Sequence, residues 1–268
     1  MQRSSIAGLH HHDDYNCSMD KRDARYNEAI DNDKAVNLER IAANIGRLQA
    51  QIPPSVEIMA VSKGIPAAAV RAAYAAGLRH FGESRIQEAA AKQVALSDLH
   101  DITWHLIGHL QTKKAKKALQ LFHWIDSLDR LDLACRLNRL LAQQSDSATS
   151  AAAQTGRKHT FSVCLQVKLA SDPNKYGWTP DELLLNIPQL LDLSHLHIRG
   201  LMTILPLGCD AERAQQLFAQ LRLWRDRLQA DKTYPVELPV LSMGMSGDFQ
   251  QAIWAGATIV RLGRVIFS

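Results

Sequence analysis

Cysteine is scarce in this chain, and long apolar runs are absent. The four cysteines, Cys17, Cys135, Cys164 and Cys209, stand far apart among 268 residues and form no CxxC pair. This spacing predicts neither a disulfide framework nor a cysteine metal site, and it is typical of a protein of the reducing cytoplasm. No run reaches the roughly 20 apolar residues of a membrane span, and the N-terminus has no secretory h-region. We therefore expect a cytoplasmic protein with no membrane partner.

An excess of one charge is also missing, because the formal net charge is only +4. Basic residues are dispersed, apart from Lys113-Lys114 and Lys116-Lys117 in a helical stretch. We interpret this cluster as a solvated helix face, with a protein-interaction surface as the alternative, and expect no nucleic-acid partner. Residues 1–33 are polar and include His10-His11-His12. We expect them to form a disordered leader without a metal site.

From residue 34 onward, short apolar runs alternate with longer amphipathic stretches. A first helix is expected over 35–51, before Pro53-Pro54. The runs expected to form strands are 57–62, 79–82, 103–107, 123–127, 162–168, 198–203, 240–242 and 259–262. The stretches expected to form helices are 66–76, 86–94, 112–121, 130–143, 180–191, 211–228 and 248–255.

Eight such units in roughly 210 residues predict a single (β/α)8 barrel of the TIM type over residues 34–268, with an extra N-terminal helix. No GxGxxG follows the first run, which argues against an open dinucleotide-binding sheet. Residues 144–158, rich in Ser, Ala, Thr and Gln, break the alternation. We expect a flexible surface loop there, on the face away from the site.

Lys63 ends the first apolar run, at the C-terminal end of a strand, where such barrels bind ligands. A partly desolvated amine at that place is a nucleophile toward carbonyls. The simpler alternative is a lysine that marks the solvated end of a strand.

The last two loops favour binding of an anion. Gly244, Ser246 and Gly247 precede a helix, and Gly263 and Arg264 follow the eighth run. Free backbone N–H groups in these loops commonly hold a phosphate in this fold. The alternative is that Ser246 only caps a helix and Gly263 only ends a strand. An amine and a phosphate site together fit pyridoxal 5′-phosphate (PLP), or a sugar phosphate held by a Schiff-base aldolase.

Seven motifs over residues 34–267 resemble the pyridoxal phosphate homeostasis proteins, whose fold is similar to the barrel domain of alanine racemases. They are M-A-V-S-K at 59–63, H-F-G-E-S-R-I-Q-E-A at 80–89, W-H-L-I-G-H-L-Q-T-K-K at 104–114, I-D-S-L-D-R at 125–130, R-G-L-M-T-I at 199–204, L-S-M-G-M-S-G-D-F at 241–249 and V-R-L-G-R-V-I-F at 260–267.

The resemblance implies a role for each matching residue. Lys63 would form the internal aldimine with PLP. The residues implied in the rest of the cofactor site are Ser246, Gly247 and Gly263 at the phosphate, Arg261 at the ring nitrogen or the phosphate, and Met243 and Ile107 against the ring.

Two positions depart from the family pattern. Ser84 stands where many members have Asn, and its hydroxyl can still donate to the cofactor. Arg264 stands where many members have Ser or Thr, so a charged contact would replace a hydroxyl ligand. Members also usually continue beyond Phe267-Ser268 into a short helix.

Racemisation needs an acid/base group on each face of the cofactor. In alanine racemases the second group is a tyrosine from a further domain, for which the chain leaves no room after the eighth strand. Tyr176, after the fifth strand, is the one tyrosine expected near the mouth. We therefore expect a monomeric PLP carrier that takes part in PLP homeostasis and supplies apoenzymes. A PLP-dependent amino-acid racemase is the alternative.

Overall fold

The strands close into one parallel barrel. The computed structural model describes residues 37–147, 160–170, 175–234 and 236–268. Each strand pairs with the next in sequence order, and β8 pairs with β1. The strands are β1 (Glu57–Val61), β2 (His80–Glu83), β3 (Thr103–Leu106), β4 (Trp124–Leu128), β5 (Phe161–Gln166), β6 (Leu196–Met202), β7 (Val240–Ser242) and β8 (Ile259–Leu262).

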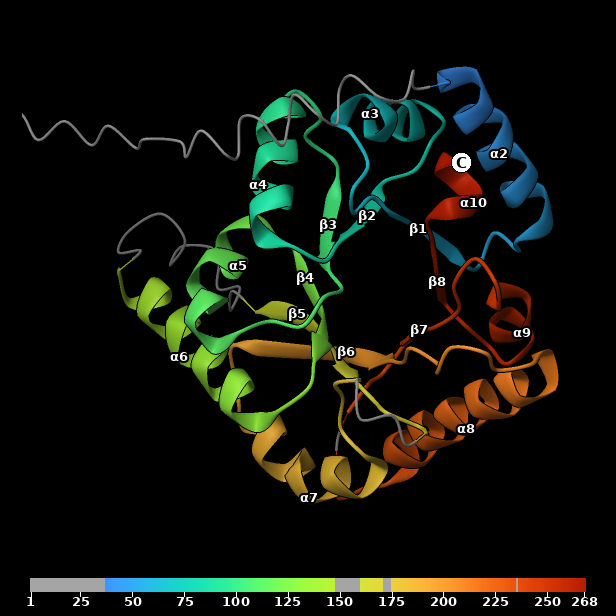
Figure 1. The fold of residues 1–268 in the computed structure, drawn as a ribbon. Helices are drawn as coiled ribbons and strands as arrows, with labels where there is room; N and C mark the ends of the chain where they lie inside the picture. The colour runs from blue at the N-terminus through green and yellow to red at the C-terminus, as the bar shows by residue number, and fades with distance from the viewer. Residues whose placement is uncertain (1–36, 148–159, 171–174, 235) are drawn as a thin grey trace, which may run out of the picture. The chain divides into compact units, whose positions relative to one another are not determined.

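Helices surround the strands (Figure 1). They are α2 (Leu38–Gln51), α3 (Ala67–Ala75), α4 (Ile86–Ala95), the 3-10 helix η1 (Thr112–Lys114), α5 (Ala115–Leu121), α6 (Leu131–Ser147), α7 (Pro180–Leu191), α8 (Ala211–Ala230), α9 (Phe249–Trp254) and α10 (Arg264–Phe267). None of these described helices is both long and apolar enough to cross a membrane.

The expected (β/α)8 barrel and its leading helix are confirmed. Three differences from the expected elements exceed two residues, and the first is that α2 begins at Leu38 instead of residue 35. α6 continues to Ser147, through the first four residues of the loop expected over 144–158, because nothing in Gln144–Ser147 breaks a helix. The short α10 was not expected, since four residues are too few to show periodicity. The leader over 1–33, Cys17 and the rest of that loop lie outside the described residues.

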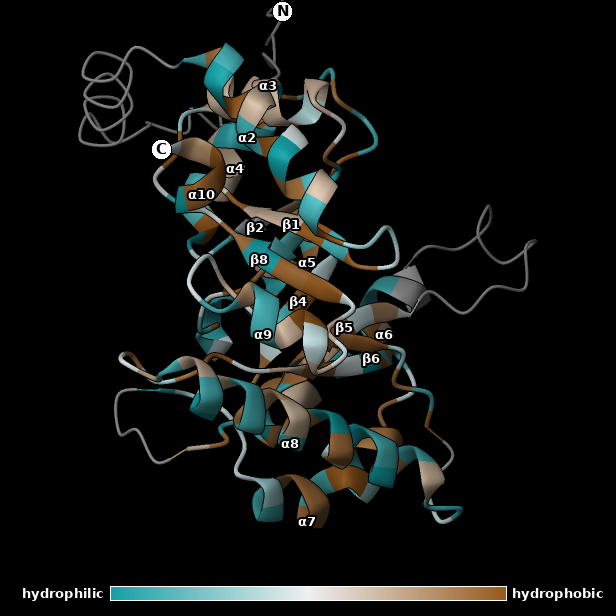
Figure 2. Cartoon of the chain, turned by 90° about the vertical axis from the view of Figure 1, so that its right-hand side faces the viewer, coloured by the Kyte–Doolittle hydropathy of each residue, from teal (hydrophilic) through white to brown (hydrophobic). Residues whose placement is uncertain are grey.

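The apolar core has two parts. The larger one lies between the strands and the helices, whose outer faces are mostly hydrophilic in Figure 2. The smaller one lies inside the barrel, where Met59 is fully buried. A side chain at Gly82 would point to the same interior, because its Cβ would lie 2.9 Å from Met59 Sδ and 3.2 Å from Ile107 Cδ1. The residues directly before and after Gly82 in β2 therefore point outward, toward the helices.

Helix α2 lies against α10, the last helix of the barrel. It packs against α3 and α10 through a face that includes Ile41, Ile45 and Leu48. The one buried polar residue on that face is Asn44, whose Nδ2 donates to the carbonyls of Ile266 (2.9 Å) and Ser268 (3.2 Å). α10 lies beside α2 in Figure 1. These bonds fix the position of the loop that follows β8.

Candidate functional site

The turn after β1 presents Lys63 at the barrel mouth, the side on which all eight strands end. Ser62 N–H still donates to the carbonyl of Gly82 at 3.0 Å, so the turn starts from an ordered strand. Gly64 then has φ +68°, a left-handed conformation that side chains disfavour. Lys63 itself is exposed. The partial desolvation expected of its amine is therefore not provided by the protein alone.

A hollow of about 440 Å³ lies between the loop after β7 and the helix α10 that follows β8. It is lined by Ser246 and Gly247 from the loop, by Arg264 and Val265 of α10, and by Ser268. Within the described part of the chain, the backbone N–H groups of Ser246 and Gly247 have no hydrogen-bond acceptor. The sequence missed one polar contributor, Asn44 of α2, which also lines the hollow. Its signal was a polar residue on an otherwise apolar helix face.

Lys63 and the hollow lie on neighbouring strands. β7, β8 and β1 are adjacent in the barrel, so their C-terminal ends share one edge. Gly263 lies beside the end of β1, because a Cβ at that position would lie 3.4 Å from the carbonyl oxygen of Val61. The loop after β7 is also tied to β8, since the N–H of Arg261 donates to the carbonyl of Gly244 at 2.9 Å.

Arg261 points into the barrel and is 3% exposed. Its Nη1 donates to Ser242 Oγ at 3.0 Å, and its Nη2 donates to the carbonyl of Thr203 at 2.6 Å. Ser242 Oγ lies 3.3 Å from Asp126 Oδ2. Burial lowers the pKa of the Arg261 guanidinium, and the charge of Asp126 opposes this shift. Hydrogen bonds thus fix the Arg261 guanidinium inside the barrel, below the mouth.

A chain of polar side chains continues from Asp126 through the barrel. Asp126 Oδ1 lies 2.9 Å from His105 Nδ1, and His105 Nε2 lies 2.9 Å from His80 Nδ1. A carboxylate can only accept, so Nδ1 of His105 is the donor. None of these three was singled out from the sequence. The sequence pattern that could have indicated them is a polar residue at an inward-facing position of an otherwise apolar strand.

His80 gives the barrel a pH dependence. Burial lowers the pKa of His80 to about 4, nearby His105 adds to this, and Asp126 opposes it. The unfolded chain therefore binds a proton at higher pH than the folded one. The stabilisation is complete above pH 6.5 and is lost as pH falls through about 4. Because His80 is only half-buried, we expect this effect to be ~1–2 kcal/mol.

Urea unfolding of the wild type and of His80→Gln at pH 7 and pH 4 measures that effect. The wild type should lose more stability on acidification than the variant, because glutamine does not titrate. Burial raises the pKa of Glu57, which interacts with the charge of His105, and its titration contributes to the loss of stability in both proteins. Equal losses in the two proteins would contradict the assignment to His80.

Three further residues implied by the resemblance lie outside the hollow, each in a different place. Ile107 is half-buried after β3 and faces the barrel interior at Gly82. Ser84 lines a second pocket of about 130 Å³, together with His109 and Lys114. Met243 is fully buried in the core between the strands and the helices. A contact of Met243 with a bound ring stays a prediction, and this burial does not favour it.

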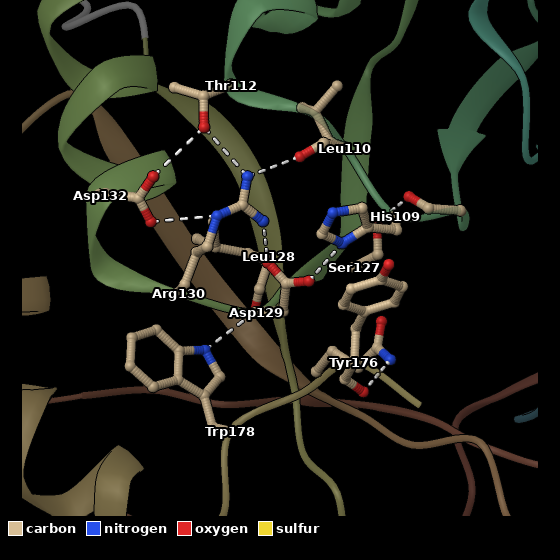
Figure 3. Close-up of polar contacts among 12 residues, drawn as sticks. His109, Leu110, Thr112, Ser127, Leu128, Asp129, Arg130, Asp132, Tyr176 and Trp178 are labelled. Carbon is tan, nitrogen blue, oxygen red and sulfur yellow. Dashed lines mark hydrogen bonds and ion pairs between the residues drawn. The ribbon is translucent and has the colours of Figure 1, made fainter. Parts of the chain in front are cut away.

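A second polar cluster lies at the mouth, beside β3 and β4 (Figure 3). His109 Nδ1 is 2.7 Å from Asp129 Oδ2, and Arg130 Nη1 donates to Asp129 Oδ1 at 2.6 Å. The ring of Tyr176 stacks on His109, with centroids 3.6 Å apart and planes at 16°. Tyr176 therefore lies near the mouth, as the sequence suggested, and the pairing of His109 with Asp129 is what the sequence did not indicate.

The mouth suits a ligand that carries both an aldehyde and a phosphate. The lysine amine is exposed, and the hollow beside it offers unpaired N–H groups and the Arg264 cation. Gly244 could not carry a side chain here, because its φ is +92° and a Cβ would lie 2.6 Å from Ala252 Cβ, and the space beside Gly247 is open. The residues present therefore fit PLP.

Comparison with known proteins defines the class. The family model of the alanine racemase N-terminal domain matches residues 36–268. An alanine racemase of Clostridium difficile has a TM-score of 0.68 over 86% of this chain and 57% of the racemase, at 13% identity. That similarity shows the fold alone. The chain is a barrel of the alanine racemase N-terminal type.

Nearer relatives have a different name. A pyridoxal phosphate homeostasis protein of Synechocystis sp. is 44% identical over 81% of this chain and 93% of its own length. Its counterpart in Pseudomonas aeruginosa is 39% identical over 87% and 94%. PipY of Synechococcus elongatus, solved with PLP bound, has a TM-score of 0.76 and 47% identity, covering 85% of this chain and all of PipY. The chain belongs to the family of the pyridoxal phosphate homeostasis proteins.

Proposed function

We propose that this chain binds PLP and takes part in intracellular PLP homeostasis. The observation that carries the proposal is the pairing of the Lys63 turn with the hollow of Ser246, Gly247 and Arg264 on adjacent strand ends. The PLP-bound structure of PipY, at 47% identity, supports the same ligand. A Schiff-base aldolase for sugar phosphates is less well supported, because no relative named above is an aldolase.

The chain's own residues divide the work of holding the cofactor. Lys63 would hold the cofactor covalently, through the reaction of its amine with the aldehyde and the loss of water. The N–H groups of Ser246 and Gly247 hold the phosphate, and Arg264 adds a charge-assisted contact. Arg261 offers a fixed cation to the ring nitrogen. When bound, PLP supplies an aldehyde that can pass to another amine.

Arg261 also bears on whether the chain is an enzyme. An unprotonated ring nitrogen beside a guanidinium makes the ring a weaker electron sink, which suits a carrier better than a catalyst of carbanion chemistry. The names of the relatives, which describe homeostasis, agree with a carrier. We therefore propose a binding and supply protein without turnover of its own, acting as a monomer.

One observation favours a racemase-like enzyme as the second candidate. The Tyr176, His109 and Asp129 cluster is a group of proton-transfer residues at the mouth, and Tyr176 is 57% exposed. Racemisation would need such a group on the face of the ring opposite Lys63. The two candidates differ in what happens when an amino acid is added.

Two measurements test the proposed function. Titrating the purified protein with PLP should produce a saturable absorption band at longer wavelength than that of free PLP. The loaded protein is then incubated with a panel of single L- and D-amino acids, and the opposite enantiomer is assayed. A carrier gives a stoichiometric spectral change without steady racemisation. Absence of the band contradicts PLP binding, and steady turnover contradicts the carrier.

The setting in which the protein works is also proposed. Cys135, Cys164 and Cys209 are free thiols, which supports a reducing cytoplasm. Recipients of PLP would be apoenzymes whose active-site lysine takes over the aldehyde. Transfer from the loaded protein to such an apoenzyme, faster than from free PLP at the same concentration, would identify a recipient.

A further inference from the structure

A buried ion cluster lies directly behind the Lys63 turn. Lys92, on α4, is the cation, and its side chain is 7% exposed. Its Nζ donates to Glu83 Oε1 at 2.6 Å, to Glu88 Oε1 at 2.8 Å and to the carbonyl of Ser62. The three protons of the ammonium thus have three acceptors. Glu83 is fully buried and Glu88 is 12% exposed, so this is not a surface ion pair.

The cluster holds the backbone on both sides of Lys63. On the N-terminal side, the carbonyl of Ser62 accepts from Lys92, and Ser62 Oγ donates to Glu83 Oε1 at 2.7 Å. On the C-terminal side, the N–H of Gly64 donates to Glu88 Oε1. Lys63 is therefore the one residue of the turn left to project, between two neighbours fixed to the same charges.

Such a cluster costs free energy that packing alone would not require. Burial raises the pKa of the Glu83 carboxyl, and Lys92 opposes the shift. Among the described residues, Glu83 Oε2 is also the buried side-chain oxygen without a hydrogen-bond partner. Apolar residues of similar volume often stabilise a fold as well as a buried ion pair does. Stability alone therefore does not explain an ion cluster behind a ligand-binding turn, and a role in positioning the turn does.

We propose that Lys92 is a positioning residue, which through Glu88 and Ser62 holds the Lys63 amine at the distance from the phosphate hollow that PLP spans. This inference rests on the proposed function. A ligand held at two points gains affinity only if both points are correctly spaced, so a loosened turn reduces the benefit of the second contact. The cluster should matter for PLP and not for an aldehyde that lacks the phosphate.

The test compares PLP with pyridoxal, which has the same aldehyde and ring without the phosphate. Dissociation constants are measured by absorption titration for the wild type and Lys92→Met. We expect Lys92→Met to weaken PLP binding about tenfold and to leave pyridoxal binding within about twofold. Gln93→Leu is the matched control on the same helix, because Gln93 Nε2 donates to the carbonyl of Leu121 and not to the Lys63 turn. It should bind both ligands as the wild type does.

A second pair of variants covers the case in which Lys92→Met does not fold. Glu88→Gln keeps an oxygen that can accept from the Gly64 N–H, so PLP binding should stay within about threefold of the wild type. Glu88→Leu removes that acceptor and should weaken PLP binding about tenfold, again without a matching loss for pyridoxal. Far-UV circular dichroism and thermal unfolding check that each variant is folded.

The outcomes separate the two proposals. If the wild type binds PLP through Lys63, and Glu88→Leu and every folded Lys92 variant bind it equally well, positioning is wrong and the proposed function stands. Equal losses for PLP and pyridoxal also overturn positioning, because they indicate a general effect on the amine or the fold. A wild type that binds no PLP overturns both proposals.

Discussion

Lys63→Ala is expected to abolish the PLP absorption band and to weaken PLP binding at least ~100-fold. The band arises from the C=N bond that only an amine can form, and Lys63 is the amine beside the hollow after β7 and β8. Lys63→Arg is the matched variant. It keeps the positive charge, but a guanidinium stays protonated and cannot condense with an aldehyde. Both variants should lose the band, and Lys63→Arg should keep more residual affinity for the phosphate.

Lys117→Ala is the control for nonspecific lysine adducts, because Lys117 is exposed on α5. Its titration with PLP should match that of the wild type. If Lys63→Arg keeps the band, the amine that holds PLP is another one, and the assignment of Lys63 is wrong whatever the affinity.

Asp126→Ala is expected to reduce the free energy of unfolding by about 3–5 kcal/mol, which is a large part of the 5–15 kcal/mol typical of a domain. The substitution removes the buried carboxylate that accepts from Ser242 Oγ and His105 Nδ1 and whose charge favours the cationic form of Arg261. Urea unfolding at pH 7, with the same slope for both proteins, measures the loss.

Asp126→Asn separates charge from hydrogen bonding. An asparagine oxygen can still accept from His105 Nδ1, so we expect a smaller loss of about 1–3 kcal/mol. PLP affinity should also fall in both variants, since Ser242 Oγ, which accepts from Arg261 Nη1, loses the carboxylate to which it donates. A loss below about 1 kcal/mol for Asp126→Ala would contradict this account, because it would show that other groups stabilise the buried guanidinium sufficiently without Asp126.

The architecture was readable from the sequence because each strand–helix unit carries its own signal. β7 and β8 begin and end as expected, and so does α7, whose start is marked by a capping box of Thr179 and Glu182 with Pro180 at its first position. Parallel pairing in sequence order then brings the residues after β7, β8 and β1 to one edge. Lys63, Gly247 and Arg264 could be grouped for that reason.

What the sequence did not reveal depends on contacts between distant segments. The approach of Asn44 to Ser268 joins residues more than 200 positions apart, and no local pattern encodes it. Lys92 looks like any solvated helix lysine until the fold places it against Glu83. The direction of side chains at the strand ends was equally hidden. Ser242, the last residue of β7, points into the barrel, but Met243 already belongs to the loop, where the alternation of a strand no longer predicts which way a side chain points.

Peptide mapping after borohydride reduction tests the central claim most directly. The protein is incubated with equimolar PLP, and hydride converts the C=N bond to a stable secondary amine before digestion and mass spectrometry. The account predicts one pyridoxyl-phosphate group per chain, on the peptide that contains Lys63. A modification found mainly on another lysine, such as Lys114 or Lys175, or no stoichiometric modification at all, would contradict it.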